Sequence, residues 1–280
     1  MSAKVSEVAC GFKETKVNLP KGNIVVTGNP NKMALNNLTK EEAKKRIDID
    51  GKLLLIFGGS QGAKKINETI LEIIKNRAFE DYSVIYATGP KNFDEVSAKV
   101  LEEDSSLYKI DKSDDSLTLF KYDDTLKKSI TYAKDKNGEK TKVETIDTTF
   151  VDRKNKIIIK KFIYNMEEVL KAADLVVSRS GALTCTEIAE VGVASILIPF
   201  PFAAENHQYF NAKTLENAKA GIIIEEKNLN SKLIMEGINE IMSDDDMRTK
   251  MENNARKLKV GNPIENIKKE IEKILNIKSL

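Results

Sequence analysis

The sequence lacks the residue types on which several functional classes depend. Its 280 residues include no tryptophan, one histidine and two cysteines. Cys10 and Cys185 are too few for a disulfide framework and are not spaced like metal ligands, which indicates a reducing compartment. The chain also shows no signal-peptide pattern and no apolar run long enough to span a membrane. Together these absences predict a cytoplasmic protein.

A strong net charge is absent as well. Lysine and arginine total 45 against 43 aspartate and glutamate residues, leaving a net charge of +2, and aromatic residues make up 6%. Because the charges are interspersed and stacking platforms are few, the composition argues against a nucleic-acid partner. With 41% hydrophobic residues, the chain can bury one large core plus a small appendage.

A glycine-bearing turn follows the first strongly apolar segment. Residues 53–57 form an uninterrupted apolar run, typical of a strand buried on both faces of a parallel sheet. After the turn at residues 58–62, apolar residues recur at helical spacing through Ile74. Backbone N–H groups and a helix dipole at such a turn favour an anion, so it predicts a phosphate site. The alternative is a turn without ligand, and the missing Lys-Ser/Thr ending argues against a P-loop kinase or ATPase.

A second turn, at residues 178–184, lies inside a strand–helix–strand unit. Residues 173–178 and 194–199 are predicted strands, and the helix between them ends at Gly192. Glu187 lies one to two turns into that helix, where its carboxylate could accept hydrogen bonds from the two vicinal hydroxyls of a ribose. The alternative interpretation is a solvated helix glutamate.

A third polar segment follows the strand at residues 194–199. Its amides and the only histidine lie at the carboxyl end of a strand, where open α/β sheets bind ligands. Gln208 and Asn211 are three residues apart, so they share a helix face and could together bind sugar hydroxyls. His207 is equally consistent with a structural role at a helix start, and we do not assign it as a catalytic base.

The predicted fold is α/β, a Rossmann-like parallel sheet with helices on both faces plus an inserted antiparallel β subdomain. The insertion covers residues 102–155, where residues 117–122, 129–132 and 142–146 read as strands and residues 136–139 as a hairpin turn. The alternative is a charged surface loop, although long loops without structure are uncommon in compact domains.

Four ordered motifs resemble those of the MurG family of UDP-N-acetylglucosamine transferases. The resemblance covers about residues 5–100 and 156–275, and it implies the carboxyl-terminal, donor-binding half of a GT-B glycosyltransferase. The motifs are Thr27-Gly28-Asn29-Pro30, residues 57–63, residues 174–184, and Asn206-His207-Gln208 with Asn211.

The family's donor contacts carry over by position. The resemblance implies that the main chain of Ile163 reads uracil, that Glu187 holds the ribose, that Ser60 contacts the diphosphate and that Gln208 reads the sugar. Lys32 stands where the family usually has arginine, which keeps the charge but loses the planar fork. The full set of implied donor-binding residues is Lys32, Gly59, Ser60, Gln61, Gly62, Phe162, Ile163, Met166, Ser180, Gly181, Ala182, Leu183, Thr184, Glu187, His207, Gln208 and Asn211.

The resemblance also implies a domain division and a reaction. Residues 1–22 resemble a remnant of the family's amino-terminal domain or an interdomain linker, and residues 23–101 with 156–280 form the donor domain. The expected reaction is an inverting transfer of N-acetylglucosamine from UDP-N-acetylglucosamine to lipid I, a lipid-linked acceptor, in peptidoglycan synthesis. The acceptor site and the general base belong to the amino-terminal domain, so we expect a separate amino-terminal half as partner and assign no catalytic residue here.

Three further expectations complete this interpretation. We expect no cofactor and no metal. Asp48-Ile49-Asp50 matches the Asp-x-Asp of metal-dependent transferases, but it lies in a charged segment before the strand at residues 53–57 rather than after a strand, so it is interpreted as surface. An acceptor at the inner face of the membrane would be reached through the partner or through a surface patch of this chain. Whether the chain comes from a split gene or a truncation stays open, and the alternative function is a non-catalytic UDP-sugar-binding module or degenerate fragment.

Overall fold

The computed structural model describes residues 5–12, 23–30, 38–59, 63–79, 81–103, 108–122, 129–134, 140–145 and 151–275. Within these residues the main sheet has eight strands in the order β12-β11-β10-β3-β4-β9-β6-β5. The six strands from β12 to β9 are parallel, and β6 and β5 are antiparallel. The strands are β3 (Leu53–Phe57), β4 (Ser83–Ala87), β5 (Tyr108–Lys112), β6 (Ser116–Tyr122), β9 (Val151–Lys160), β10 (Leu175–Ser178), β11 (Ala194–Leu197) and β12 (Gly221–Ile223).

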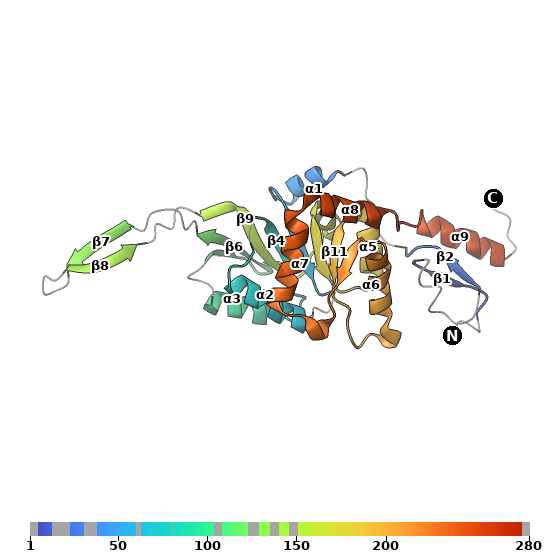
Figure 1. The fold of residues 1–280 in the computed structure, drawn as a ribbon, viewed down its shortest axis with the longest axis horizontal. Helices are drawn as coiled ribbons and strands as arrows, with labels where there is room; N and C mark the ends of the chain where they lie inside the picture. The colour runs from blue at the N-terminus through green and yellow to red at the C-terminus, as the bar shows by residue number, and fades with distance from the viewer. Residues whose placement is uncertain are drawn as a thin grey trace.

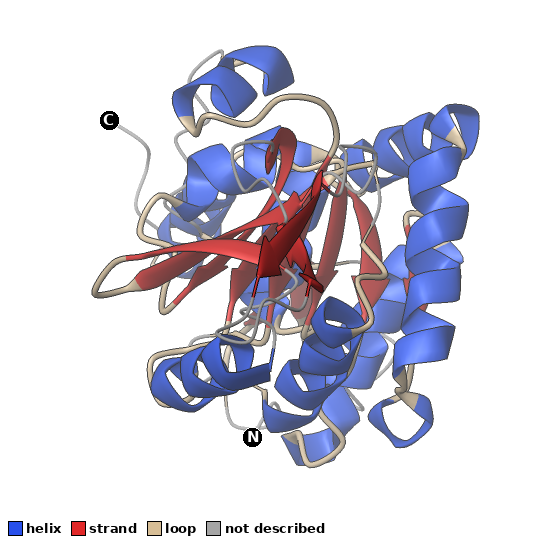
Figure 2. Cartoon of the chain, turned by 90° about the vertical axis from the view of Figure 1, so that its left-hand side faces the viewer, coloured by secondary structure: helices blue, strands red, loops and turns tan. Residues whose placement is uncertain are grey.

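Helices cover both faces of this sheet (Figure 2). Apolar residues of α2 (Lys64–Lys75), α3 (Phe93–Glu103) and α7 (Ser231–Ser243) pack on one face. The opposite face is covered by α1 (Lys40–Arg46), α4 (Met166–Ala172), α5 (Ala182–Val191) and α6 (His207–Asn217). The expected Rossmann-like α/β fold is confirmed.

Alternation along β3 explains why its sequence is apolar throughout. Leu54 and Ile56 join the core on the α2 side, whereas Leu53, Leu55 and Phe57 join the core on the α5 side. Because successive side chains of a strand point to opposite faces, a strand covered by helices on both sides needs no polar positions. The same reasoning holds for β10, which is buried at every position.

The order of the strands creates a topological switch point between β3 and β10. From β3 the chain continues through α2 to β4, whereas from β10 it continues through α5 to β11, away from β4. The two helices therefore leave neighbouring strands toward opposite faces of the sheet. Open α/β sheets bind ligands in the crevice at the carboxyl ends of such strands.

The antiparallel strands expected in residues 102–155 are present, but β5 and β6 extend the main sheet. Leu117 and Leu119 of β6 pair with Ile159 and Ile157 of β9, and all four side chains are buried in the core on the α2 side. This shared core explains why β6, and β5 with it, joins the main sheet beside β9. The remaining pair, β7 (Ser129–Lys134) and β8 (Lys140–Thr145), forms a hairpin that projects from the body (Figure 1). The predicted turn at residues 136–139 lies outside the described residues.

A second, small unit lies at the end of the molecule opposite the β7–β8 hairpin (Figure 1). Its strands β1 (Val8–Cys10) and β2 (Ile24–Val26) are parallel, and α9 (Pro263–Ile274) lies beside them. Asn266 donates a hydrogen bond to the carbonyl of Thr27 (3.1 Å), and Lys273 forms an ion pair with Glu7 (3.2 Å). β1 lies before the predicted boundary between residues 22 and 23, and β2 lies after it, yet the two strands pair with each other and not with the main sheet. The boundary itself stays a prediction.

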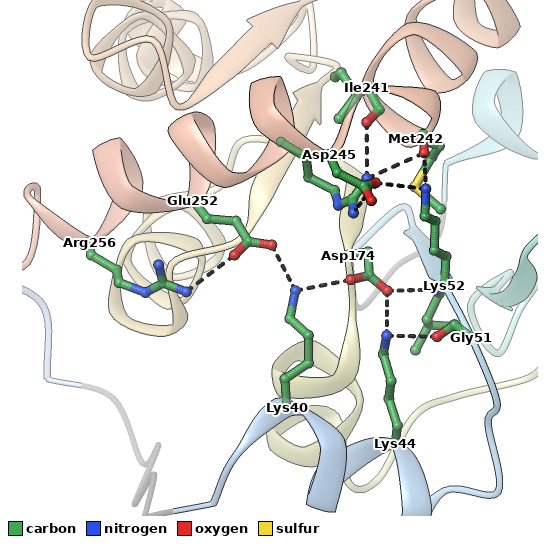
Figure 3. Close-up of polar contacts among 12 residues, drawn as sticks. Lys40, Lys44, Gly51, Lys52, Asp174, Ile241, Met242, Asp245, Glu252 and Arg256 are labelled. Carbon is green, nitrogen blue, oxygen red and sulfur yellow. Dashed lines mark hydrogen bonds and ion pairs between the residues drawn. The ribbon is translucent and has the colours of Figure 1, made fainter.

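At the amino ends of β3 and β10, a charged network surrounds the buried Asp174 (Figure 3). Its carboxylate accepts a hydrogen bond from the amide of Leu53 (2.8 Å) and forms ion pairs with Lys40 (3.1 Å) and Lys44 (2.8 Å). Burial by itself would raise the pKa of Asp174, but the two lysines and the Leu53 amide outweigh it, and the pKa is lowered. Lys40 also pairs with Glu252 (2.7 Å) of α8 (Asp245–Arg256), which ties that helix to α1.

Candidate functional site

The two predicted turns lie side by side. Phe57, the last residue of β3, pairs with Ser178, the last residue of β10, so the chain leaves both strands at the same level of the sheet. Gly59 has φ +84°, and a Cβ atom built there would meet nothing within 4 Å. That backbone conformation favours glycine. Lys32, Ser60, Gln61 and Gly62 lie outside the described residues, so their roles stay predictions.

Within the described residues, neither helix that begins at this crevice has a side-chain cap. Ala63 precedes α2 and Gly181 precedes α5, and neither residue has a side-chain oxygen that could accept a hydrogen bond from the helix. Neither first turn contains an acidic residue, and α2 begins with Lys64 and Lys65. By contrast, α1 begins with a complete capping box at Thr39 and two glutamates. Uncapped N–H groups and the positive end of the dipole leave both sites open to an anion.

Glu187 lies on α5 with a half-buried side chain, and burial raises the pKa of its carboxyl group. Among the described residues, no side chain or backbone group forms a hydrogen bond or ion pair with this carboxylate. Half-buried carboxylates without partners are costly and concentrate at functional sites. The position favours the predicted role over that of a solvated helix glutamate, because vicinal hydroxyls of a ligand would supply the missing donors.

Ser180, Gln208 and Asn211 come together and join α6 to the turn after β10. The Ser180 hydroxyl donates to the carbonyl of Gln208 (2.8 Å), and the Asn211 side-chain amide donates to the carbonyl of Ser180 (3.1 Å). The Gln208 Oε1 atom accepts from the amide of Phe200 (3.0 Å). These bonds use the oxygen of the Gln208 side-chain amide and the nitrogen of the Asn211 side-chain amide. Within the described part of the chain, the Nε2 group of Gln208 and the Oδ1 atom of Asn211 form no hydrogen bond, so both are available to a ligand.

His207 is the first residue of α6, and its ring is exposed. Its Nδ1 atom lies 2.7 Å from the carbonyl oxygen of Ala204, in the short helix η3 (Ala204–Asn206) that precedes α6. This contact gives the histidine the structural role at a helix start that the sequence left open. The predicted contact of His207 with the sugar stays a prediction.

The predicted uracil-reading segment follows β9. The side chain of Ile163 is buried in the same core as Cys185 and Ile188 of α5, with Met166 packed against it. Phe162 is exposed and forms an edge-to-face contact with Tyr164, with ring centroids 5.2 Å apart. No hydrogen bond to the main chain of Ile163 is found within the described ranges. The buried side chain of Ile163 thus fixes its backbone on the face of the sheet that α5 covers, the helix that carries Glu187. The backbone N–H and carbonyl groups of Ile163 are available to the nucleobase of a ligand.

Arg179 is a residue whose importance sequence reasoning missed. Its buried guanidinium donates to the carbonyls of Ile198 and Pro199 (both 3.2 Å), forms an ion pair with Glu226 of the short helix η4 (Glu226–Asn228), and lies over the Phe200 ring at 5.4 Å. It therefore holds the turn after β11 against the turn after β10. The sequence does show an arginine directly after a predicted buried strand, which could have indicated a structural or binding role. Its partner Glu226 is 47 residues away, so the sequence did not reveal the ion pair.

Asn29, in the first predicted motif, contacts the start of α5. Its side-chain amide donates to the hydroxyl of Thr186 (2.9 Å) and to the carbonyl of Ala182 (3.3 Å). The hydroxyl of Thr186 in turn donates to the same carbonyl (2.9 Å). The motif that contains Gly28 and Asn29 thus supports the helix that carries Glu187. Ala182 and Leu183 are exposed at the N-terminus of that helix, and Thr184 is half-buried.

A family profile described as the glycosyltransferase family 28 C-terminal domain matches residues 53–134 and 127–271. The chain belongs to this family. The transferases that it resembles include one from Acetivibrio thermocellus, 32% identical over all of this chain, and one from Thermoanaerobacter sp. strain X514, 35% identical over 98% of it. Both are named UDP-N-acetylglucosamine--N-acetylmuramyl-(pentapeptide) pyrophosphoryl-undecaprenol N-acetylglucosamine transferase. The chain spans 63% of the length of each relative.

Solved structures agree on the fold of this glycosyltransferase domain. MurG from Acinetobacter baumannii superposes with a TM-score of 0.64 at 23% identity, over 97% of this chain and 62% of that one. A glycosyltransferase from Rickettsia africae superposes with a TM-score of 0.55 at 13% identity, over 98% of this chain and 64% of that one. At these identities the likeness concerns the fold alone.

The Asp48-Ile49-Asp50 segment and the grouping of possible ligand side chains bear on whether the domain could hold a metal ion. Asp48 and Asp50 are exposed before the amino end of β3, on the side of the sheet opposite the crevice, which agrees with their interpretation as surface. Within the described part of the chain, no three histidine, cysteine, aspartate or glutamate side chains are grouped to hold a metal ion. No helix described there has the length and apolar character needed to cross a bilayer.

A cavity of about 570 Å³ lies beside α5. It is bounded by the segments around Phe12 and Gly28, by α5, and by the connection from α8 to α9. Its lining includes Thr186, one turn into α5, but no described residue of the turns after β3 and β10. Because it does not lie at the carboxyl ends of the strands, we do not assign it to the donor.

Proposed function

We propose that this chain binds UDP-N-acetylglucosamine and forms the donor-binding part of a glycosyltransferase. The observation that carries the proposal is that two helices without a side-chain cap among the described residues begin at the carboxyl ends of the neighbouring strands β3 and β10. Both present N–H groups and a positive dipole end where a diphosphate would lie. Phosphate recognition of this kind does not depend on the base or the sugar, so other groups must provide specificity.

Groups on the carboxyl side of the sheet supply that specificity in the proposal. The Glu187 carboxylate accepts hydrogen bonds from the ribose hydroxyls, and the main chain of Ile163 pairs with the uracil edge. Gln208 donates from Nε2 to a sugar hydroxyl while its Oε1 atom stays bound to Phe200. The turn residues Ser180 and Gly181 face the diphosphate and the sugar together with the first turn of α5, which contains Ala182, Leu183 and Thr184. Asn211 holds the turn in place through the carbonyl of Ser180.

The proposed reaction is an inverting transfer in which an acceptor hydroxyl attacks the anomeric carbon opposite the departing UDP. The bond from the anomeric carbon to the diphosphate oxygen breaks, and the negative charge that develops on UDP is stabilised by the two helix N-termini. The acceptor proton passes to a base outside the residues assigned here. By likeness to the named relatives, the proposed acceptor is their undecaprenyl-linked muramyl pentapeptide, reached through an acceptor-binding half at the inner face of the membrane.

Calorimetric titration with UDP-N-acetylglucosamine, UDP and ADP tests the donor site. We expect UDP to bind more tightly than ADP, because the Ile163 backbone matches the hydrogen-bonding edge of uracil. Equal affinities would remove Ile163 from the proposed site. Adding the acceptor-binding part of a relative together with its acceptor then tests turnover. Donor binding without any transfer in that mixture would favour the alternative, a UDP-sugar-binding module without catalysis.

A further inference from the structure

A buried polar pair holds the helix that carries the first proposed phosphate-binding N-terminus. Tyr86 lies on β4 with 0% of its surface exposed, and Asn67 ends the first turn of α2 with 4% exposed. The Tyr86 hydroxyl donates to Asn67 Oδ1 at 2.6 Å. The Asn67 Nδ2 group donates to the carbonyl of Thr88 at 3.2 Å. Both halves of the asparagine amide are therefore used inside the core.

The surroundings of this pair are otherwise apolar. Ile66, Ile70 and Val84 belong to the same buried core as the Tyr86 ring. Two apolar side chains of matching shape would fill this space without desolvating a hydroxyl and an amide, and such replacements are often nearly neutral for stability. Hydrogen bonds differ from apolar packing in having a fixed length and direction. The pair therefore fixes how far α2 lies along the sheet and how it is rotated.

The location of the pair connects it to the crevice. The amide of Asn67 donates to the carbonyl of Ala63 (2.9 Å), the residue that precedes the uncapped end of α2. Thr88, the other partner, follows β4 directly, and its amide donates to the carbonyl of Lys160 (3.1 Å) at the end of β9. The Asn67 side chain thus links the first turn of α2 to the carboxyl end of β4, and the backbone of Thr88 continues the connection to the end of β9.

The opposite end of α2 has a matching contact. The buried hydroxyl of Tyr108, on β5, donates to the carbonyl of Ile74 at 3.0 Å, near the end of the helix. Two buried tyrosines thus hold one helix at its two ends, and the Tyr86 contact is the one beside the crevice. Burial raises the pKa of Tyr86 well above its usual value, so its hydroxyl remains a donor at any pH at which the protein would be assayed.

We propose that Tyr86 and Asn67 are positioning residues that hold the N-terminus of α2 where its N–H groups meet the diphosphate of the donor. The inference rests on the proposed function, and neither residue touches the ligand. A helix end displaced by a fraction of an ångström would still be helical and folded. Its N–H groups would no longer converge on the phosphate oxygens, so the affinity for a diphosphate would fall while that for a nucleoside would not.

The test compares UDP with uridine, which carries no phosphate, in Tyr86→Phe and in wild type. We expect the affinity for UDP to fall about three- to tenfold, the range that corresponds to one hydrogen bond. The affinity for uridine, followed by NMR titration, should stay the same. Asn67→Leu, which removes the pair from the helix side, should lower the UDP-to-uridine affinity ratio in the same way.

Tyr108→Phe is the matched control, because it removes a buried hydroxyl that bonds the same helix at its far end. We expect it to lower the melting temperature about as much as Tyr86→Phe and to leave the UDP-to-uridine affinity ratio unchanged. An unchanged ratio in Tyr86→Phe, or an equal fall in Tyr108→Phe, would overturn the inference. A wild-type chain that binds UDP no better than uridine would instead overturn the proposed diphosphate site.

Discussion

At the scale of single residues, Glu187 combines burial with the lack of a partner. Its carboxyl pKa is raised by burial, and the described residues supply neither a cation nor a hydrogen-bond donor. The charged form therefore costs stability in the free protein, and a ligand with two hydroxyls would relieve that cost. The charged carboxylate therefore lowers the stability of the free protein but favours ligand binding. A substitution that removes the charge should change these two properties in opposite directions.

Glu187→Gln should stabilise the free chain at neutral pH and weaken UDP binding about tenfold or more, as expected for hydrogen bonds to a charged group. Because the folded pKa of Glu187 is raised, the wild-type chain is destabilised above that pKa and recovers as the pH falls toward the unfolded value. The stability gain of the variant should therefore shrink in acid. Thermal melts and UDP titrations between pH 4 and 8 measure both effects, and a variant that binds UDP like wild type would exclude Glu187 from the site.

The two atoms of the Gln208 side-chain amide have different proposed roles, which can be tested separately. Gln208→Glu keeps an oxygen that can accept from the Phe200 amide but loses the Nε2 donor. The added charge should repel UDP, whose terminal phosphate carries the greater negative charge, at least as strongly as UDP-N-acetylglucosamine. A fall in the affinity for UDP-N-acetylglucosamine relative to UDP would therefore report the lost contact with the sugar. We expect that ratio to fall several-fold, on the order of 1 kcal/mol. Equal losses for the two ligands would remove Gln208 from the sugar site.

At the scale of elements, the end of α5 depends on a glycine for two reasons. Gly192 has φ +73°, and a Cβ atom there would collide with the Arg256 side chain of α8. Gly192→Ala combines the cost of a left-handed residue, about 1–2 kcal/mol, with the displacement of Arg256. Since Arg256 also pairs with Glu252 (3.3 Å), the change should loosen the contact between α5 and α8.

Gly51 provides the matched control for that substitution. It has the same φ of +73°, but a Cβ atom there would meet nothing within 4 Å. Gly51→Ala should therefore show only the cost of the backbone conformation. We expect Gly192→Ala to lower the unfolding free energy by more than Gly51→Ala, as measured by urea denaturation. Equal losses would mean that Arg256 moves aside without cost.

At the scale of the whole molecule, Asp174 joins α1, β3 and β10, and α8 through Lys40 and Glu252 (Figure 3). Asp174→Asn would leave Lys44 buried without its counterion, and we expect a loss of roughly 3 kcal/mol, the lower end for breaking a buried ion pair. Because the folded pKa of Asp174 is lowered, its contribution is complete above the unfolded value and is lost as the pH falls through the folded one. The gap between wild type and variant should close in acid, as urea denaturation at pH 7 and pH 3 would show.

The local units of this fold could be predicted because each depends on neighbours in the chain. The apolar run of β3, the glycine turn after it and the end of α5 at Gly192 follow from periodicity and from backbone preferences of single residues. The candidate positions Glu187, Gln208 and Asn211 could be named because a motif places them at fixed distances from a strand end. Gln208 and Asn211 also meet Ser180 in the structure.

The sequence by itself determined which segments become strands and helices and which turns could bind an anion. Only the tertiary structure decided that β10 pairs with β3, that β5 and β6 join the main sheet, and that Arg179 meets Glu226 and Tyr86 meets Asn67. Strand pairing uses backbone groups that every residue shares, so the choice of partner leaves little trace in local sequence. That choice is made by the burial of whole faces at once, which brings distant residues together.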